Sequence, residues 1–175
     1  FGGTGGGVWK TIDGGSNWKN ISDKFFGSSI GAVTIAPSDN TIIYVGEGEN
    51  SLRGNVSEGF GIWRTDDGGR NWRHLGLKDT RHIIRIIVHP KNPDVVWVAA
   101  MGHLFGPNEE RGVFKTTDGG KSWQQVLFVN DETGVIDMAV AESNFTVMYA
   151  SAWQKDRKAH NFNGNGKASG IYKST

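Results

Sequence analysis

Apolar residues gather in three pairs of short runs along the chain. The pairs lie at residues 31–35 and 41–45, 83–88 and 95–99, and 135–140 and 145–150. Turn-forming residues separate the two runs of each pair, at 36–40, 89–94 and 142–144. Short, nearly continuous apolar runs rich in β-branched residues predict strands buried on both faces. No segment has a sustained period of 3.6 residues, so we expect almost no helix.

Between these pairs one polar string recurs. Thr-x-Asp-x-Gly-x-Asn/Ser-Trp occupies residues 11–18, 65–72 and 116–123, each time directly after an apolar stub at 7–10, 61–64 or 112–115. The aspartates Asp13, Asp67 and Asp118 are 54 and 51 residues apart. A unit of this length that recurs along a chain indicates a repeat architecture.

Each unit is predicted to contain four antiparallel strands, A to D, with the polar string as the turn between C and D. Such units, which need neighbours to bury both faces, are typical of propeller blades. A parallel β-solenoid is the main alternative, but its repeats are normally shorter. The predicted fold class is therefore all-β, a β-propeller segment of four-stranded antiparallel blades.

The whole chain, 1–175, is interpreted as one such segment. It comprises strands C and D of one blade at 8–26, a blade at 30–76, a blade at 83–128 and a partial blade at 135–175. Known propellers have about four to eight blades, so we expect the remaining blades in the same longer chain. Residues 171–174 match the stub, and Ser174 takes the place of Thr11, as at the start of a fourth string. The glycine run 2–7 is expected to be a loop that enters strand C.

Every residue of the string has a role in folding. Aspartate accepts hydrogen bonds within its own turn, glycine adopts positive φ, and tryptophan packs over the hairpin while its indole finds an acceptor. Because a catalytic group is needed once, three successive copies favour this structural interpretation over a metal or catalytic one. The predicted structural residues are Thr11, Asp13, Gly15, Trp18, Thr65, Asp67, Gly69, Trp72, Thr116, Asp118, Gly120 and Trp123.

The three strings resemble the Asp-box, or BNR, repeat of sialidases, xyloglucan hydrolases, sortilin-type receptor domains and a photosystem II assembly factor. The stretch 98–120 is also similar to segments of large secreted bacterial proteins with sortilin-like propellers. The resemblance covers essentially the whole chain and is specific for fold rather than activity. It implies that the box lies on the propeller face away from the ligand site. It also implies a secreted, periplasmic or cell-surface protein of bacterial origin.

Composition limits the classes of partner and of chemical site that this chain can have. The 19 basic and 18 acidic residues nearly cancel and form no long run, which disfavours nucleic acid or an anionic membrane as the main partner. No apolar stretch is long enough for a membrane span. The absence of cysteine excludes disulfides, thiolate metal sites and a cysteine nucleophile. Neither a metal nor another cofactor is expected, and the expected partner is a protein or a glycan.

Function is expected on the face that carries the B–C and D–A loops. The B–C loops, at 47–60, 102–111 and 153–166, are long, unequal and rich in charged and aromatic residues, whereas the A–B turns and the boxes are short and regular. Unequal loops on a regular scaffold are where binding usually occurs. The candidate ligand-binding residues are Glu47, Glu49, Asn50, Arg53, His82, Arg85, His103, Glu109, Arg111, Asp137, Trp153 and Arg157.

Each candidate also has an alternative interpretation. The group from Glu47 to Arg53 recognises a sugar or a peptide terminus, or else ties its own loop together with Glu–Arg pairs. Arg85 and Asp137 hold equivalent positions in strand A of successive blades, where Ala32 stands in the preceding blade. They line a channel or, in the favoured interpretation, pair between blades. His82 and His103 lack the spacing of a metal site.

Three functions are compatible with these residues. The favoured one is a non-catalytic recognition module that binds protein or glycan on its loop face. A glycoside hydrolase needs two carboxylates roughly 5–10 Å apart, which predicts Glu47 or Glu49 near a second loop carboxylate in an open cleft. A scaffold subunit of a larger assembly is the third.

Overall fold

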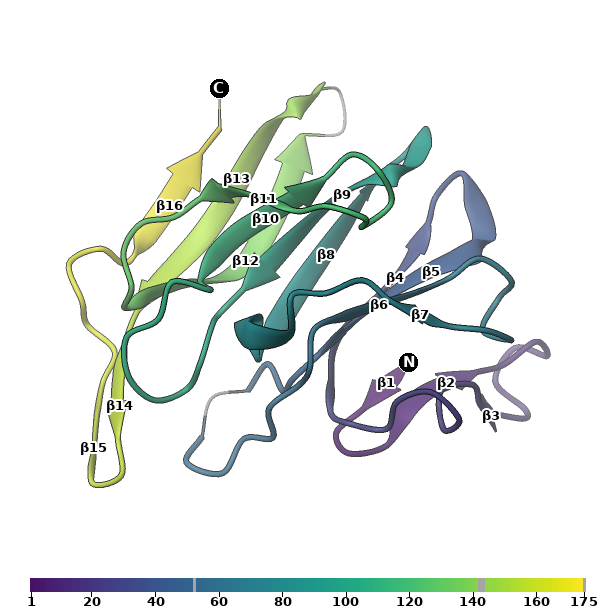
Figure 1. Ribbon diagram of the computed structural model, residues 1–175, viewed down its shortest axis with the longest axis horizontal. Helices are drawn as coiled ribbons and strands as arrows, with labels where there is room; N and C mark the ends of the chain where they lie inside the picture. Colours follow the sequence, from purple (N-terminus) through teal and green to yellow (C-terminus); the bar gives the residue numbers. More distant parts are fainter. Residues whose placement is uncertain (52, 142–143, 175) are drawn as a thin grey trace.

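The computed structural model describes residues 1–51, 53–141 and 144–174. Four antiparallel sheets lie side by side in the order of the sequence, from the N-terminal sheet to the C-terminal one (Figure 1). In the described part of the chain the only helix is a 3₁₀ turn, η1 (Lys78–Thr80), and nothing there forms a helix with the length and hydropathy that a membrane crossing requires. The all-β prediction is confirmed.

Each sheet is a meander in which neighbours in sequence are neighbours in space. The first contains β1 (Gly2–Gly3), β2 (Gly7–Lys10) and β3 (Lys19–Asn20). The second contains β4 (Ile30–Ala36), β5 (Asp39–Glu47), β6 (Ile62–Thr65) and β7 (Arg73–His74). The third contains β8 (Ile83–His89), β9 (Asn92–Ala100), β10 (Gly112–Thr116) and β11 (Gln124–Leu127). The fourth contains β12 (Thr133–Ala141), β13 (Asn144–Gln154) and β16 (Gly170–Lys173), and a hairpin of β14 (Asp156–Lys158) and β15 (Asn161–Asn163) leaves its end.

Two segments expected to be loops contain strands. The glycine run folds back so that Gly2 pairs with Val8 and Gly3 with Gly7. Gly5 and Gly7, with φ of 62° and 64°, permit the tight reversal. The third B–C loop contains the β14–β15 hairpin, in which Arg157 pairs with Phe162. Both hairpins depend on tight reversals of polar or glycine-rich segments that lack the apolar alternation of a strand.

Hydrophobic cores fill the spaces between consecutive sheets. Tyr44, Ile62 and Ile83 belong to the core between the second and third sheets, and Trp97, Val135 and Met138 to the core between the third and fourth. The second strands β5 and β9 are buried over their C-terminal halves. Burial on both faces was predicted for the first strands too, and this is wrong for β4, because Ile35 is 54% exposed. Nearer its start the strand is covered, because Gly2 of β1 packs on Ile30 and Val33.

The first strands β4, β8 and β12 contact one another in succession. They approach closely: a Cβ on Gly31 would lie 2.2 Å from the carbonyl oxygen of Ile83. The register of each first strand shifts once near its start, so that Ala32, Arg85 and Asp137 all follow an irregularity in the pairing. A bulge re-aims the residues beside it. The equivalent positions proposed for these three residues therefore share the same local geometry.

The turns and loops separate to two opposite edges (Figure 1). The β4–β5 and β8–β9 turns and the boxes lie at one edge. The β5–β6 and β9–β10 loops, η1 and the β14–β15 hairpin lie at the other, which we call the loop face. Residues 142 and 143 of the predicted turn 142–144 lie outside the described residues, as does Leu52 in the first loop.

Candidate functional site

The box aspartates are engaged within their own turns. In the second box, Asp67 Oδ1 accepts from Thr65 Oγ1 at 2.8 Å and from the Asn71 backbone N–H at 2.9 Å. Its Oδ2 accepts from the Asn71 side chain at 2.7 Å, while the Gly69 N–H donates to Thr65 Oγ1 at 2.9 Å. The other two boxes repeat this pattern around Asp13 and Asp118.

These contacts hold the aspartates in their ionised form. The backbone N–H and side chain of Asn17, with Thr11, lower the pKa of Asp13 to about 2. The corresponding hydrogen bonds from Asn71 and Thr65 lower the pKa of Asp67, and those from Ser122 and Thr116 lower that of Asp118. Carboxylates with lowered pKa and filled acceptor sites cannot serve as general acids at neutral pH.

On the loop face the two candidate acids of the first loop are buried and occupied. Glu47 accepts from the Phe60 N–H and from Trp63 Nε1, both at 3.1 Å, and from the Ser28 hydroxyl. Glu49 pairs with Arg53 at 2.8 Å and accepts from the Ser57 N–H at 3.0 Å. Burial alone would raise the pKa of Glu49, but the Ser57 N–H and the Arg53 guanidinium outweigh it, and the pKa is lowered. Glu47 ties the loop to its own sheet, and Glu49 ties the loop to itself.

Two cations are buried beneath the second loop. Arg111 is 1% exposed, and its Nη atoms donate to the carbonyl oxygens of Met101, Glu132, His103 and Gly106 at 2.9 to 3.4 Å. Lys155 is 3% exposed and donates to the His103 and Leu104 carbonyl oxygens at 3.3 and 3.4 Å. Within 4.0 Å neither cation has a carboxylate partner among the described residues.

The environment of these cations disfavours their charge. Burial, with a smaller contribution from the neighbouring Arg111, lowers the pKa of Lys155 to about 8. Burial also lowers the pKa of Arg111, although Asp131 and Glu132 oppose this. A buried charge without a counter-charge is expensive. An anion placed beside these two cations would offset that cost.

Three buried side-chain nitrogens in the described residues have no hydrogen-bond partner, and all three belong to loop-face residues. They are Nε2 of His82, Nε2 of His103 and Nε of Arg157. The ring of His82 is fully buried and contacts the Glu49 carbonyl oxygen through Nδ1 at 3.0 Å, and burial lowers its pKa. Buried polar atoms nearly always have partners. We call the five residues the basic cluster: His82, His103, Arg111, Lys155 and Arg157.

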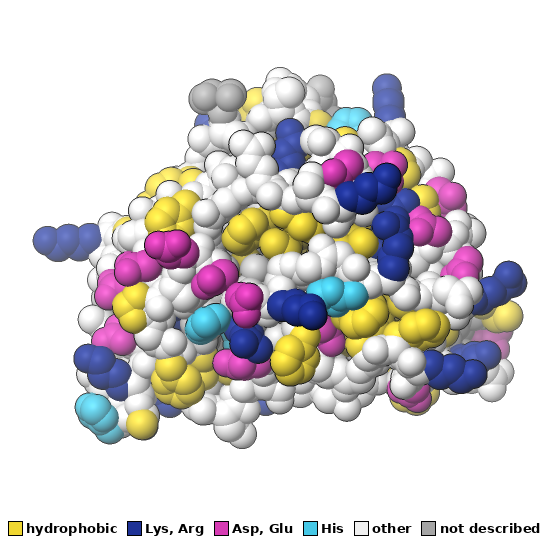
Figure 2. All heavy atoms as spheres, viewed as in Figure 1, with side chains coloured by type: hydrophobic (Ala, Val, Ile, Leu, Met, Phe, Trp, Pro, Cys, Tyr) yellow, Lys and Arg dark blue, Asp and Glu magenta, His cyan; other side chains and the backbone are white. Residues whose placement is uncertain are grey.

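The basic cluster joins three elements of different sheets. His103 and Arg111 come from the β9–β10 loop, Lys155 and Arg157 from the end of the fourth sheet, and His82 from the segment after η1. Arg157 reaches the first loop, since a Cβ on Gly54 would lie 2.8 Å from its Nη2. Basic, acidic and histidine side chains gather around the position of η1 (Figure 2).

The other candidates lie apart from this cluster or hold structure. Arg85 and Asp137 form an exposed pair between the third and fourth sheets, 3.6 Å apart. Trp153 donates to the Gly164 carbonyl oxygen at 2.8 Å and packs edge-on against Phe162. Asn50 and Glu109 are exposed, and Asn50 accepts from the Ser51 hydroxyl. The described residues hold no group of three or more His, Asp or Glu placed to bind a metal.

Lys155 was missing from the sequence-based candidates. It lies in a stretch with four other charged or titratable residues, 156–160, and nothing in its immediate neighbours distinguishes it from the exposed Lys158. Its burial follows from packing against the β9–β10 loop some fifty residues earlier. The alternation along β13 buries Ala150 and Ala152 and, if continued, would place Lys155 on the opposite face, so no local signal indicated its burial.

A row of antiparallel three- and four-stranded meanders, three of which contain a self-satisfied Asp-box between their last two strands, defines an Asp-box β-propeller segment. The chain belongs to the Sortilin-Vps10 family, whose model, described as "Sortilin, neurotensin receptor 3", matches residues 6–167. The expected resemblance is confirmed.

Solved structures agree on the fold. An ancestral GH74 enzyme superimposes with a TM-score of 0.66 at 20% identity, over 87% of this chain and 20% of that one. A GH74 enzyme from Niastella koreensis superimposes with a TM-score of 0.63 at 16% identity, over 99% of this chain and 26% of that one. This chain thus spans about a fifth to a quarter of those proteins and is a partial propeller. No curated protein matched.

Proposed function

We propose that this segment belongs to a recognition propeller that binds a protein or glycan ligand with anionic groups through its loop face. The observation that carries the proposal is the basic cluster: two buried cations without carboxylate partners beside three buried nitrogens without hydrogen-bond partners, within the described residues. A carboxylate, sulfate or phosphate oxygen would accept from the buried cations and from Arg157 Nε, and charge-assisted hydrogen bonds are about twice as strong as neutral ones.

A glycoside hydrolase is the second candidate, because the similar solved structures are described as GH74 enzymes. The contacts of Glu47 and Glu49 argue against these acids as its catalytic pair. Glu47 accepts three hydrogen bonds and Glu49 pairs with Arg53, so neither is an available proton donor or nucleophile. A hydrolase would have to take its carboxylates from other blades. We therefore favour binding without turnover for this segment, in a secreted, periplasmic or cell-surface bacterial protein.

The test is a titration of the chain with acidic and neutral oligosaccharides and with acidic peptides, with product analysis of every mixture. We expect acidic ligands to bind and remain intact. Lys155→Met should weaken binding at least tenfold, whereas the matched Lys158→Met, which changes an exposed lysine paired with Asp156, should leave it unchanged. Equal binding by the two variants would refute the site. Cleaved oligosaccharide would instead support the hydrolase.

A further inference from the structure

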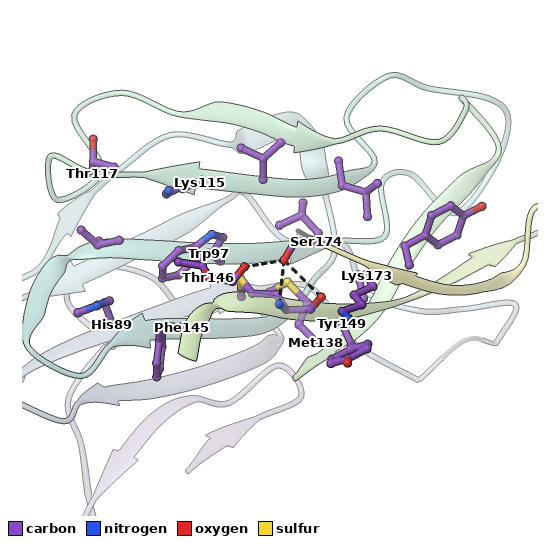
Figure 3. A pocket seen from close by; sticks show the side chains of 17 residues that line it. His89, Trp97, Lys115, Thr117, Met138, Phe145, Thr146, Tyr149, Lys173 and Ser174 are labelled. Atoms are coloured by element: carbon purple, nitrogen blue, oxygen red, sulfur yellow. Dashed lines mark hydrogen bonds between the residues drawn. The ribbon is translucent and has the colours of Figure 1, made fainter. Parts of the chain in front are cut away.

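A groove of about 630 Å³ lies between the third and fourth sheets, at the end where β11 and β16 face each other. Its walls carry apolar side chains, among them Trp97, Val126 and Tyr172, together with Lys115, Thr146 and Ser174 (Figure 3). By size and lining it resembles a ligand pocket. Its position on the repeat, however, points to a different occupant.

The two earlier inter-sheet spaces each contain a box tryptophan. Trp72 Nε1 donates to the Ile21 carbonyl oxygen of the preceding sheet at 2.8 Å, and Trp123 Nε1 donates to that of Leu75 at 2.8 Å. Each acceptor is the third residue after the preceding box tryptophan. The third residue after Trp123 is Val126, which lines the groove and is 44% exposed.

A box glycine packs on the same acceptor residue. A Cβ on Gly69 would lie 2.5 Å from Ile21 Cδ1, and a Cβ on Gly120 would lie 2.5 Å from Leu75 Cδ1. Only a glycine therefore fits against these side chains. Val126 presents its side chain at the corresponding position of the third sheet.

Two polar contacts position the turn. The first of the two consecutive glycines in a box donates its N–H to a carbonyl oxygen of its own sheet. Gly68 donates to Thr41 at 2.8 Å, and Gly119 donates to Asp94 at 3.0 Å. In the second box the Gly68 carbonyl oxygen also accepts from Lys10 Nζ of the preceding stub at 2.9 Å, whereas at the third box the stub residue Arg64 donates to the Asp94 carboxylate instead. The corresponding acceptor in the fourth sheet is Thr146, whose N–H bonds back to Asn144 as Thr41 does to Asp39.

Both of these partners face the groove. Lys115 occupies the stub position of Lys10, and its Nζ lies 5.1 Å from the centre of the Trp97 ring. The Thr146 carbonyl oxygen accepts from the Ser174 hydroxyl at 2.9 Å (Figure 3). Ser174 in turn stands where Thr11, Thr65 and Thr116 begin their boxes.

We propose that the groove is the seat of a fourth box turn of the same propeller, of the form Asp-x-Gly-x-Asn/Ser-Trp, and is not a ligand pocket. Its tryptophan donates to the Val126 carbonyl oxygen, and its glycine packs on the Val126 side chain. The residue between its aspartate and its glycine, equivalent to Gly68, donates its N–H to the Thr146 carbonyl oxygen. The carbonyl oxygen of that same residue accepts from Lys115. When the turn is in place, the Ser174 hydroxyl no longer donates to the Thr146 carbonyl oxygen and instead accepts a hydrogen bond from the turn. The proposal is independent of the proposed ligand.

The test adds a box to this chain. A copy of residues 118–127 is joined after Thr175, and amide exchange and thermal unfolding are compared with the original chain. We expect the added box to raise Tm by several degrees and to slow exchange at Leu127 and Met148 at least tenfold. A control extension in which glycine is replaced by valine and tryptophan by alanine should do neither. Equal behaviour of the two extensions would overturn the proposal.

A second variant, Val126→Arg, distinguishes a fourth box from a second copy of the chain as the occupant of the groove. Val126→Arg changes a half-exposed side chain, so the unextended chain should keep its Tm, but the extended chain should lose the stabilisation. If the unextended chain is a dimer that Val126→Arg dissociates, as light scattering would show, a second copy fills the groove and the proposal fails. If Val126→Arg leaves the extended chain as stable as before, the box does not occupy the groove, and the proposal fails as well.

Discussion

The box edge and the loop face of this molecule differ in how they use their polar groups. At the box edge, three turns repeat the same hydrogen bonds with the same partners, and each aspartate is satisfied within eight residues of sequence. On the loop face, no two loops are alike, two buried cations have only carbonyl partners, and three buried nitrogens have no hydrogen-bond partner among the described residues. Polar residues that repeat thus stabilise the fold, whereas polar residues left unsatisfied mark where a ligand can bind.

The largest expected effect concerns the packing of the box edge. Gly120 has φ of 87° and faces Leu75 of the preceding sheet, so Gly120→Ala combines backbone strain with a clash. We expect a loss of roughly 3 kcal/mol of unfolding free energy. Gly14→Ala is the matched control, because Gly14 has φ of 69° but nothing within 4 Å, and about 1 kcal/mol is expected. Urea unfolding measures both, and equal losses would show that the inter-sheet contact contributes little.

The second prediction concerns Lys155 on the loop face, where a substitution should increase stability rather than decrease it. Because the pKa of Lys155 falls from 10.5 unfolded to about 8 folded, the unfolded state binds more protons between these values, and stability rises with pH across that window. The rise should reach roughly 3 kcal/mol at most. Lys155→Met should remove this rise and increase stability at pH 7 by about 1 kcal/mol. Urea midpoints from pH 7 to 10.5 provide the measurement, and a variant that keeps the rise would contradict the assignment.

The third prediction returns to the boxes in acid. The folded pKa of Asp13 is lowered to about 2 from 3.8, and those of Asp67 and Asp118 are lowered too. Their stabilisation is present above about pH 4 and disappears as pH falls through the folded values. Asp118→Asn should be less stable than the parent at pH 6, and the difference should shrink steadily as the pH is lowered below about 4. A constant difference across this range would separate the aspartate's role from its charge.

The smallest effect is expected for the pair between the third and fourth sheets. Arg85 and Asp137 are 56% and 68% exposed and 3.6 Å apart, and exposed pairs contribute at most about 1 kcal/mol. A double-mutant cycle with Arg85→Ala and Asp137→Ala should give a coupling below about 0.5 kcal/mol at physiological salt. A larger coupling would place these residues among the groups that define the site.

The sequence predicts the features that short-range chemistry determines. Each box is complete within eight residues, and the paired apolar runs appear as β4–β5, β8–β9 and β12–β13. The burial of Lys155 and the lack of a hydrogen-bond partner for His82 Nε2 could not be predicted, because both depend on loops of different sheets meeting in space. The exposed face of β4 was missed for the same reason, since continuous apolar runs do not reveal which neighbours are present.

The direction of the tryptophan bonds bears on how the propeller assembles during synthesis. Trp72 and Trp123 both donate to carbonyl oxygens that lie about fifty residues closer to the N-terminus. A chain leaving the ribosome therefore already contains each acceptor when the tryptophan that needs it emerges. Within this segment, docking of each blade onto the one before it therefore needs no part of the chain that is still to be translated.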